Sequence, residues 1–451
     1  MIRHENAVHP QWRELNAFTF LDPRVARRFD EQVGGDWRAH ELPTDQNRVP
    51  LAGGQIVVKD NIEVAGMPCT LGTPALRHYV AARDAAAIVR LRAAGVEIVG
   101  KTNLHELAYG IRSNNAAFGP VRNPHDLRCI AGGSSGGTAV AIAAGLVRAG
   151  LGTDTGGSSR IPAALCGIVG FRPTVGRYPV SGVALISPTR DVIGPMGRTV
   201  HDVAALDAIL ADGLPAALDA VDLRTIRLGT PRQHFRENLD ASVDRAFEAA
   251  QRRLREAGVT LIEADLPNVA AVDAAVSFPV VLYETRAALE AYLDHTGSTV
   301  TLATLCAQIA STDVKEIMAQ VIGGAIPEPV YREALSVHRP ALRTLYRSYF
   351  AEHRVDAILF PTTPLPARPI EGSDRVVTLN GVDVPTFATY IRNTDPASNA
   401  GIPGISLPAG SHPPADGAAA PLPVGIELDG PDGSDRRLLA IAAAIESTLS
   451  P

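Results

Sequence analysis

Two clusters rich in glycine and serine contain the residues whose types and spacing best suit chemistry. The first cluster is residues 132–137 (GGSSGG), and the second is residues 154–160 (DTGGSSR). Glycines beside a serine let the backbone approach a ligand closely and direct several N–H groups toward one point. Such N–H groups can stabilise the oxyanion that develops during acyl transfer. The spacing alone also fits two tight turns or an anion-binding loop, so these alternatives stay open.

The lysines are a second source of candidate chemistry. Lysine occurs only at Lys59, Lys101 and Lys315, although lysine and arginine together number 42. Arginine stays protonated in proteins, whereas a buried lysine can lose its proton and act as a base. Lys315 lies in a polar run, and we expect it on a solvated helix face. Lys59 and Lys101 each end a run of β-branched residues. The bias of this chain toward arginine, with a few lysines left by chance, also explains their presence.

Other chemistries have weaker support. The first cluster matches G-x-S-x-G around Ser134 and Ser135, but residues 123–128 do not resemble the buried strand that a nucleophile elbow requires. His105 lacks the second histidine of an HExxH motif, and we expect it to form a structural hydrogen bond. Neither cluster follows the glycine patterns of nucleotide-binding loops. We therefore predict no metal and no cofactor.

The composition predicts a globular protein. The chain has 451 residues, of which 46% are hydrophobic and 20% charged, so it can bury a sizeable core. Its net charge of −6 provides no basic surface for a nucleic acid or an anionic membrane. No apolar run reaches the ~18–20 residues that span a bilayer, and no signal peptide or disulfide framework is visible. We expect a soluble, cytoplasmic protein.

The elements that must position these residues alternate between strand and helix. Residues 55–58 predict a strand that stops at Lys59, and residues 96–100 predict a strand that stops at Lys101. Between them we expect a helix that Asp84 caps. This alternation favours an α/β fold with helices flanking a sheet.

Further along the chain the pattern continues, and no long linker divides it. Ser158 is expected near the N-terminus of a helix that starts in the run IPAAL. The other expected elements are a helix over 138–146, a strand–helix–strand unit over 222–262, mostly helix over 270–350, strands over 357–360, 405–408 and 424–428, and a last helix over 436–449.

Residues 132–174 strongly resemble the amidase signature family. They combine GGSSGG, a small-residue helix and the run GTDTGGSSRIPAALCGIVGFRPT. The resemblance covers about residues 50–450, and it departs mildly from the family pattern at Ile130-Ala131 and at Ser159. Matching segments are residues 58–61 (VKDN), 100–103 (GKTN), 188–197 (PTRDVIGPMG), 361–364 (PTTP) and 422–428 (LPVGIEL).

The resemblance implies an amidase that hydrolyses linear amides with a Ser–Ser–Lys triad. Lys59 would be the base, Ser134, after a cis peptide bond, would relay protons, and Ser158 would be the nucleophile that forms an acyl-enzyme. The oxyanion hole would consist of the N–H groups of Thr155, Gly156, Gly157 and Ser158. Supporting roles around the triad would fall to Ser135, Asp154, Arg160 and Lys101.

The family also implies an α/β/α layered fold, with a large mixed twisted sheet covered by helices on both faces. We expect a single domain over residues 1–451, with a polar, irregular N-terminal arm over 1–50 that contains a helix around 24–32. The signature core would span 51–200, and a helical substrate-pocket region would span 270–350.

Residues 102–123 and the C-terminal segment most resemble the mandelamide and indoleacetamide hydrolase branch. This likeness implies a small aryl amide, anilide or carbamate as substrate. Tyr109 and Ile111 would line the pocket, although plain core packing explains them equally well. Two alternatives remain, an A-type glutaminase subunit of glutamyl-tRNA amidotransferase acting in a complex and a catalytically silent binding protein. Homodimer formation is left open.

Overall fold

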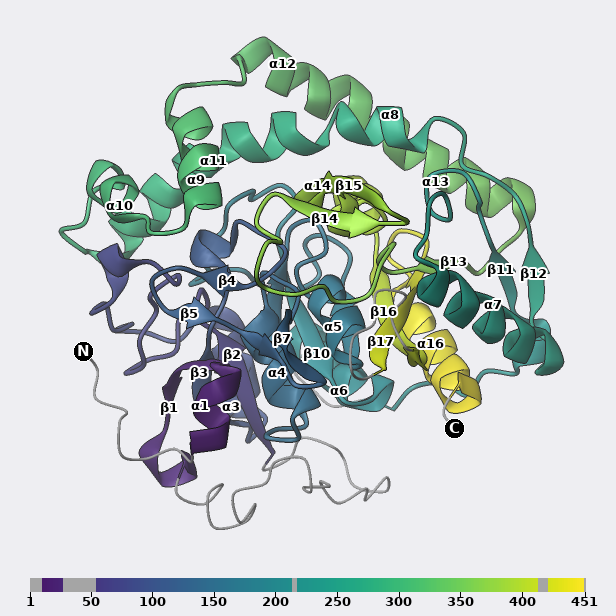
Figure 1. The fold of residues 1–451 in the computed structure, drawn as a ribbon, viewed down its shortest axis with the longest axis horizontal. Coiled ribbons are helices and arrows are strands. Elements are labelled where there is room, and N and C mark those ends of the chain that lie inside the picture. Colours follow the sequence, from purple (N-terminus) through teal and green to yellow (C-terminus); the bar gives the residue numbers. More distant parts are fainter. Residues whose placement is uncertain (1–9, 27–53, 213–216, 413–420, 450–451) are drawn as a thin grey trace.

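A large mixed sheet forms the centre of the molecule (Figure 1). The computed structural model describes residues 10–26, 54–212, 217–412 and 421–449. The sheet has eleven strands among these residues. In spatial order they are β1 (Phe18–Leu21), β3 (Glu97–Thr102), β2 (Gln55–Lys59), β8 (Ala149–Asp154), β10 (Val192–Gly197), β9 (Val169–Arg172), β16 (Gly404–His412), β17 (Leu422–Asp429), β13 (Ala357–Pro361), β11 (Arg227–Gly229) and β12 (Thr260–Ile262).

The pairing of these strands is mixed, as the resemblance to the amidase signature family implied. β2 runs parallel to β3 and to β8, and β11 runs parallel to β12 and to β13. The other neighbours are antiparallel. Because β2, β3 and β8 are parallel, the C-terminal ends of these strands meet at one edge of the sheet. Lys59 and Asp154 are the last residues of β2 and β8, so they share that edge.

Helices cover both faces of the sheet. Along β2, Val57 packs in one apolar cluster with the helices that follow the two serine clusters. Ile56 and Val58 point the other way, into a second cluster. This alternation is the two-residue period of a strand that is buried on both sides. The covering helices are α4 (Gly136–Ala143) and α5 (Arg160–Cys166) on the first face, and α3 (Ala86–Ala93) and α6 (Val200–Asp212) on the second.

The predicted helical region is confirmed, and it forms the upper arch in Figure 1. It consists of α8 (Val269–Ala274), α9 (Ser277–Thr296), α10 (Leu302–Gln308), α11 (Thr312–Ile322), α12 (Glu328–Glu333), a π-helical turn at Ala334–His338 and α13 (Arg339–His353). The remaining helices are α1 (Pro10–Leu15), α7 (Ala241–Glu256), α14 (Thr386–Ile391), α15 (Asp395–Ala400) and α16 (Asp435–Leu449), with short 3₁₀ turns at Pro74–Leu76, Glu106–Ala108 and Leu223–Thr225. Three small hairpins pair β4 (Asn114–Asn115) with β5 (Gly119–Pro120), β6 (Arg122–Asn123) with β7 (Asp126–Ile130), and β14 (Val376–Leu379) with β15 (Val382–Pro385).

Some local predictions need correction. Asp84 does not cap α3, because Ala85 is the capping residue and the Asp84 carboxylate instead accepts the Ala65 N–H and pairs with Arg92. The N-terminal arm is not wholly irregular, since β1 pairs with β3 as a strand of the main sheet. Residues 27–32 of the expected arm helix lie outside the described residues.

Candidate active site

Lys59 lies at the C-terminal end of β2 with its side chain completely buried. Its Nζ atom is 2.7 Å from Ser134 Oγ and 2.8 Å from Thr153 Oγ1. Burial disfavours the charged amine and lowers the pKa of Lys59 from 10.5 to about 7, although Asp154 and Asp191 act in the opposite direction. A substantial fraction of this amine is therefore neutral near pH 7, which is the state that a base requires.

Ser134 belongs to the turn that leads into α4. The Gly133–Ser134 peptide bond is cis. The Ser134 carbonyl oxygen accepts the N–H of His105 at 3.2 Å and the hydroxyl of Ser113 at 3.3 Å. These contacts fix the backbone on one side of the residue while its hydroxyl faces Lys59. The structure thus brings together the predicted base and the predicted relay.

Ser158 lies between β8 and the first residue of α5 and is 9% exposed. The N–H of Ser135 donates to the Ser158 carbonyl oxygen at 3.1 Å, so the two serine clusters are in direct backbone contact. The Ser158 hydroxyl forms no hydrogen bond with another described residue. Its predicted position near the start of a helix is confirmed. Unlike Ser134, it has an unbonded hydroxyl and some access to solvent.

Glycine is required immediately before Ser158. Gly157 has φ +131°, a conformation that residues with a side chain rarely adopt. A Cβ atom added there would lie 2.1 Å from Thr394 Oγ1. A Cβ atom on Gly156 would lie 2.6 Å from Asp395 Oδ1. The two glycines therefore allow Thr394 and Asp395 to pack directly against the loop.

The Asp154 carboxylate binds both the backbone and the charged side chains of the second cluster. Its carboxylate accepts the N–H of Gly157 at 2.9 Å and the N–H of Ser159 at 3.2 Å. Arg160 and Arg172 form ion pairs with the same carboxylate at 3.1 and 3.0 Å, and all three side chains are fully buried. Burial alone would raise the pKa of Asp154, but the two guanidinium groups outweigh burial and hold the pKa below its usual range. Asp154 and Arg160 thus lie in direct contact with the loop, and their supporting role in catalysis stays a prediction.

The four N–H groups predicted for the oxyanion hole differ in their partners. The Gly157 N–H donates to Asp154. The N–H groups of Thr155, Gly156 and Ser158 donate to no acceptor among the described residues. These three groups are the ones that remain available to an oxyanion.

Ser135 and Lys101 have structural contacts. The Ser135 hydroxyl donates to the Thr153 carbonyl oxygen at 3.2 Å and accepts the Thr153 N–H at 3.3 Å. Lys101 Nζ pairs with Asp60 at 3.1 Å and donates to the Pro68 carbonyl oxygen at 2.8 Å. Both side chains are buried. Lys101 therefore forms an ion pair, whereas the hydrogen bonds of Lys59 Nζ within the described part of the chain go to two hydroxyl groups.

Tyr109 and Ile111 are both buried in apolar clusters. The Tyr109 hydroxyl bonds with the Thr285 hydroxyl on α9. Ile111 belongs to the same cluster as Ile161, a residue in the first turn of α5, which begins shortly after Ser158. Their part in a substrate pocket stays a prediction. His105 makes the expected structural hydrogen bond, with Nε2 3.0 Å from Asp313 Oδ2, and Lys315 is exposed on α11 as predicted.

Sequence reasoning missed four residues that contact the site or change its electrostatics. Thr153 contacts the Lys59 amine, and Asp191 lies close enough to raise the Lys59 pKa. Arg190 and Thr394 donate to carbonyl oxygens of the loop that bears Ser158. A signal existed for three of them, since Thr153 and the pair Arg190-Asp191 stand inside matched motifs. Thr394 lies in the loop 392–403, which the sequence suggested as part of the substrate pocket, but its contact with the Gly156 carbonyl appears only in the folded chain.

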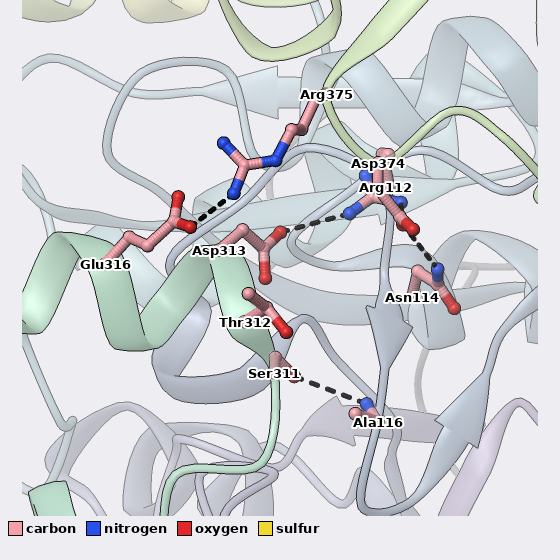
Figure 2. A pocket seen from close by; sticks show the side chains of 9 residues that line it. All are labelled: Arg112, Asn114, Ala116, Ser311, Thr312, Asp313, Glu316, Asp374 and Arg375. Carbon is pink, nitrogen blue, oxygen red and sulfur yellow. Dashed lines mark hydrogen bonds and ion pairs between the residues drawn. The ribbon is translucent and has the colours of Figure 1, made fainter.

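A surface pocket of about 290 Å³ contains none of the predicted catalytic residues (Figure 2). Its charged side chains pair with one another. Arg112 bridges Asp313 and Asp374, and Arg375 pairs with Glu316. We assign this pocket no part in the chemistry.

The described residues contain no group of three or more histidine, cysteine, aspartate or glutamate side chains that could hold a metal ion. Within the same residues, no helix combines the length and apolar character that a membrane crossing needs. The four cysteines are free thiols.

Comparisons with known proteins agree with this geometry. Residues 11–439 match the family model described as Amidase. The chain is 44% identical to an indoleacetamide hydrolase of Agrobacterium vitis, over 94% of this chain and 91% of that relative. It is 43% identical to a mandelamide hydrolase of Pseudomonas putida, over 97% of this chain and 85% of that relative.

The comparison of the fold with crystal structures indicates the same family. A crystal structure of an amidase superposes with a TM-score of 0.79 at 33% identity and covers 98% of this chain and 93% of the other. The predicted α/β fold with a large mixed sheet is thereby confirmed. The chain therefore belongs to the amidase signature family and is an enzyme that hydrolyses amide C–N bonds.

Proposed function

We propose that the chain hydrolyses small aryl-bearing amides through an acyl-enzyme on Ser158, with Lys59 as the base and Ser134 as the proton relay. The observation that carries this proposal is the contact between a buried lysine amine and the Ser134 hydroxyl at 2.7 Å. The lowered pKa of Lys59, about 7, supports a neutral amine at physiological pH. A buried base of this kind matches the requirement of general base catalysis near neutral pH.

In the first half of the reaction, Lys59 takes the Ser134 proton while Ser134 takes the Ser158 proton. Ser158 Oγ attacks the amide carbon, and the carbonyl oxygen becomes an oxyanion that the N–H groups of Thr155, Gly156 and Ser158 stabilise. The relay then returns a proton to the amide nitrogen, because an amine leaves poorly as an anion. The C–N bond breaks, ammonia or an amine departs, and the acyl group stays on Ser158.

In the second half, water replaces the amine. Its proton passes through Ser134 to Lys59 as its oxygen attacks the acyl carbon. The second tetrahedral oxyanion occupies the same place as the first. Collapse releases the carboxylic acid and returns a proton to Ser158, so that the net reaction is amide plus water to acid plus amine.

Two lines of support favour an aryl group in the substrate. The similar indoleacetamide and mandelamide hydrolases are named for amides that carry an aromatic ring. In this chain, Ile391 on α14 packs against Gly156, with its Cδ1 2.8 Å from a Cβ placed there. One turn earlier, Phe387 contacts Phe278 of α9, with ring centroids 6.1 Å apart, and Phe278 is 48% exposed. These side chains offer apolar contact beside the loop.

The test combines labelling with a substrate panel. A fluorophosphonate should attach to Ser158, located by peptide mass spectrometry, and Ser158→Ala should abolish both labelling and hydrolysis of phenylacetamide-like amides. Anilides, carbamates and glutamine belong in the same panel. Full activity in Ser158→Ala, or a label on another residue, would exclude the mechanism.

The alternative of an amidotransferase glutaminase subunit is not favoured, because the similar relatives are named as hydrolases of aryl amides. Hydrolysis of glutamine in preference to every aryl amide in the panel would reverse that judgement.

A further inference from the structure

We propose that Arg190 is a positioning residue for amide hydrolysis, because it fixes the Thr155–Gly156 peptide so that the Gly156 N–H faces the substrate oxyanion. The inference rests on the proposed function, since it concerns the oxyanion that forms when Ser158 attacks.

The loop from Asp154 to Ser158 has an unusual set of contacts. Each of its five carbonyl oxygens accepts a hydrogen bond. The donors are Arg172 Nη1 to Asp154 at 2.7 Å, Arg190 Nε to Thr155 at 2.9 Å, Thr394 Oγ1 to Gly156 at 2.6 Å, the Ile161 N–H to Gly157 at 2.8 Å, and the Ser135 N–H to Ser158 at 3.1 Å.

These contacts determine where the loop N–H groups point. In a trans peptide the C=O and the following N–H point in opposite directions, and this loop contains no cis bond. A donor that fixes the Thr155 carbonyl on one side therefore directs the Gly156 N–H to the other. That N–H donates to no acceptor among the described residues. The Thr155 carbonyl is thus fixed on one side of its peptide, and the Gly156 N–H points to the other side.

Arg190 is itself firmly held. Its side chain is about 3% exposed. Besides Thr155, it donates to Asp395 Oδ1 at 2.7 Å, to Asn399 Oδ1 at 2.5 Å and to the Ser277 carbonyl oxygen at 3.3 Å. A Cβ on Gly156 would lie 3.0 Å from Arg190 Nη2, so the guanidinium packs against the loop. Arg190 thereby joins the loop to the first residue of α9 and to α15.

Thr394 provides an internal comparison. It fixes the Gly156 carbonyl, but the N–H of that peptide belongs to Gly157 and already donates to Asp154. Loss of the Thr394 hydroxyl leaves that N–H held by a carboxylate. Loss of the Arg190 Nε contact frees the Thr155 carbonyl oxygen, and the N–H of the same peptide, that of Gly156, has no acceptor among the described residues that would keep its direction. We therefore expect Arg190 to matter more for the oxyanion than Thr394.

The experiment compares Arg190→Lys with Thr394→Val and the wild-type chain. Lysine keeps the positive charge opposite Asp395, but its single nitrogen cannot replace all four guanidinium contacts. For Arg190→Lys, kcat should fall about ten- to hundredfold with KM within about threefold. The effect is smaller than the factor of about 10²–10³ that is typical for removal of an oxyanion donor, because the Gly156 N–H stays present and loses only its fixed direction. Thr394→Val should lower kcat less than Arg190→Lys does. Arg343→Lys is the matched control, since Arg343 Nε also donates to a backbone carbonyl, that of Ala400, at 2.9 Å.

The affinities of two inhibitors distinguish a positioning role from a general structural role. An arylmethyl boronic acid forms a tetrahedral adduct on the serine and should bind Arg190→Lys more weakly by about the factor lost in kcat. The arylacetic acid product should bind as it does to the wild-type chain. The acid limb of the pH profile should also stay in place, because the contact between Lys59 and Ser134 is retained.

The proposal is overturned if folded Arg190→Lys keeps wild-type kcat, or if both inhibitors lose affinity equally. If Arg190→Lys fails to fold, the double variant Arg190→Gln with Asp395→Asn replaces the ion pair by a neutral pair. For that variant, the affinity for the boronic acid is compared with the affinity for the arylacetic acid in the same way. Failure of the underlying mechanism looks different, since it would appear as an active Ser158→Ala.

Discussion

The two serine clusters are held in opposite ways. The Ser134 cluster contacts Lys59 through the Ser134 hydroxyl, and the Ser134 carbonyl oxygen accepts hydrogen bonds from the neutral His105 backbone N–H and the Ser113 hydroxyl. The Ser158 cluster sits among full charges, with Asp154 bonded to two loop N–H groups and to two arginines. A proton relay works when its base is free to be neutral, whereas an oxyanion site needs dipoles that do not move. The surroundings of each cluster match the task proposed for it.

The largest predicted effect separates two buried lysines. Lys59→Met should lower kcat by about 10⁴-fold, as expected for loss of the base from a unit of residues that act together. The fold should survive, because Lys59 has no ion-pair partner among the described residues. Steady-state kinetics and thermal unfolding measure the two effects.

Lys101→Met is the matched control. It leaves the fully buried Asp60 carboxylate without its cation, which typically costs about 3–5 kcal/mol of stability. Activity per folded molecule should fall far less than in Lys59→Met. An inactive, fully stable Lys101→Met would contradict the assignment of a structural role to Lys101 and a catalytic role to Lys59.

The Ser158 cluster should lose stability and rate together. Asp154→Asn removes the charge that balances Arg160 and Arg172, and it weakens the acceptor for the Gly157 and Ser159 N–H groups. We expect a loss of about 3–5 kcal/mol in the free energy of unfolding, since a buried charge loses its partner. We also expect kcat to fall by about 10²-fold as the oxyanion donors lose their fixed direction. Denaturant unfolding and kcat provide the check, and a stable but slow variant would contradict the account.

The smallest predicted effect concerns Thr153. Thr153→Val keeps the side-chain shape but removes the hydroxyl that lies 2.8 Å from Lys59 Nζ. Because that hydroxyl accepts from the protonated amine, its loss should lower the apparent pKa of Lys59 further. The acid limb of the pH profile should move to lower pH, with kcat at its plateau changed less than tenfold. A shift to higher pH would contradict this assignment.

Much of the fold was readable from the sequence because the signals are local. The β-branched run before Lys59, the alternating segments of residues 222–262 and the helical stretch 270–350 all predicted the right elements. The errors occurred where tertiary contacts override local preference. Asp84 looks like a helix cap but bonds instead to Ala65. Residues 18–21 look irregular yet gain strand structure from pairing with β3.

The candidate site divides in the same way. Lys59, Ser134 and Ser158 stand in motifs that resemble a known family, and the structure brings Lys59 to Ser134. Arg190 and Thr394 act on the loop from 35 and 238 residues away in the chain, a proximity that no local pattern encodes.

The central claim is that Lys59 activates Ser158 as a neutral amine. Its most direct test is the pH dependence of the second-order rate at which a fluorophosphonate labels Ser158, since labelling needs nucleophile activation and no product release. A folded-state pKa of about 7 means that the protonated, inactive amine dominates at lower pH. The rate should therefore rise with pH along a single titration centred near 7, and Lys59→Met should show a low rate without that titration. A rate that is flat from pH 5.5 to 9, or a titration that persists in Lys59→Met, would contradict the account.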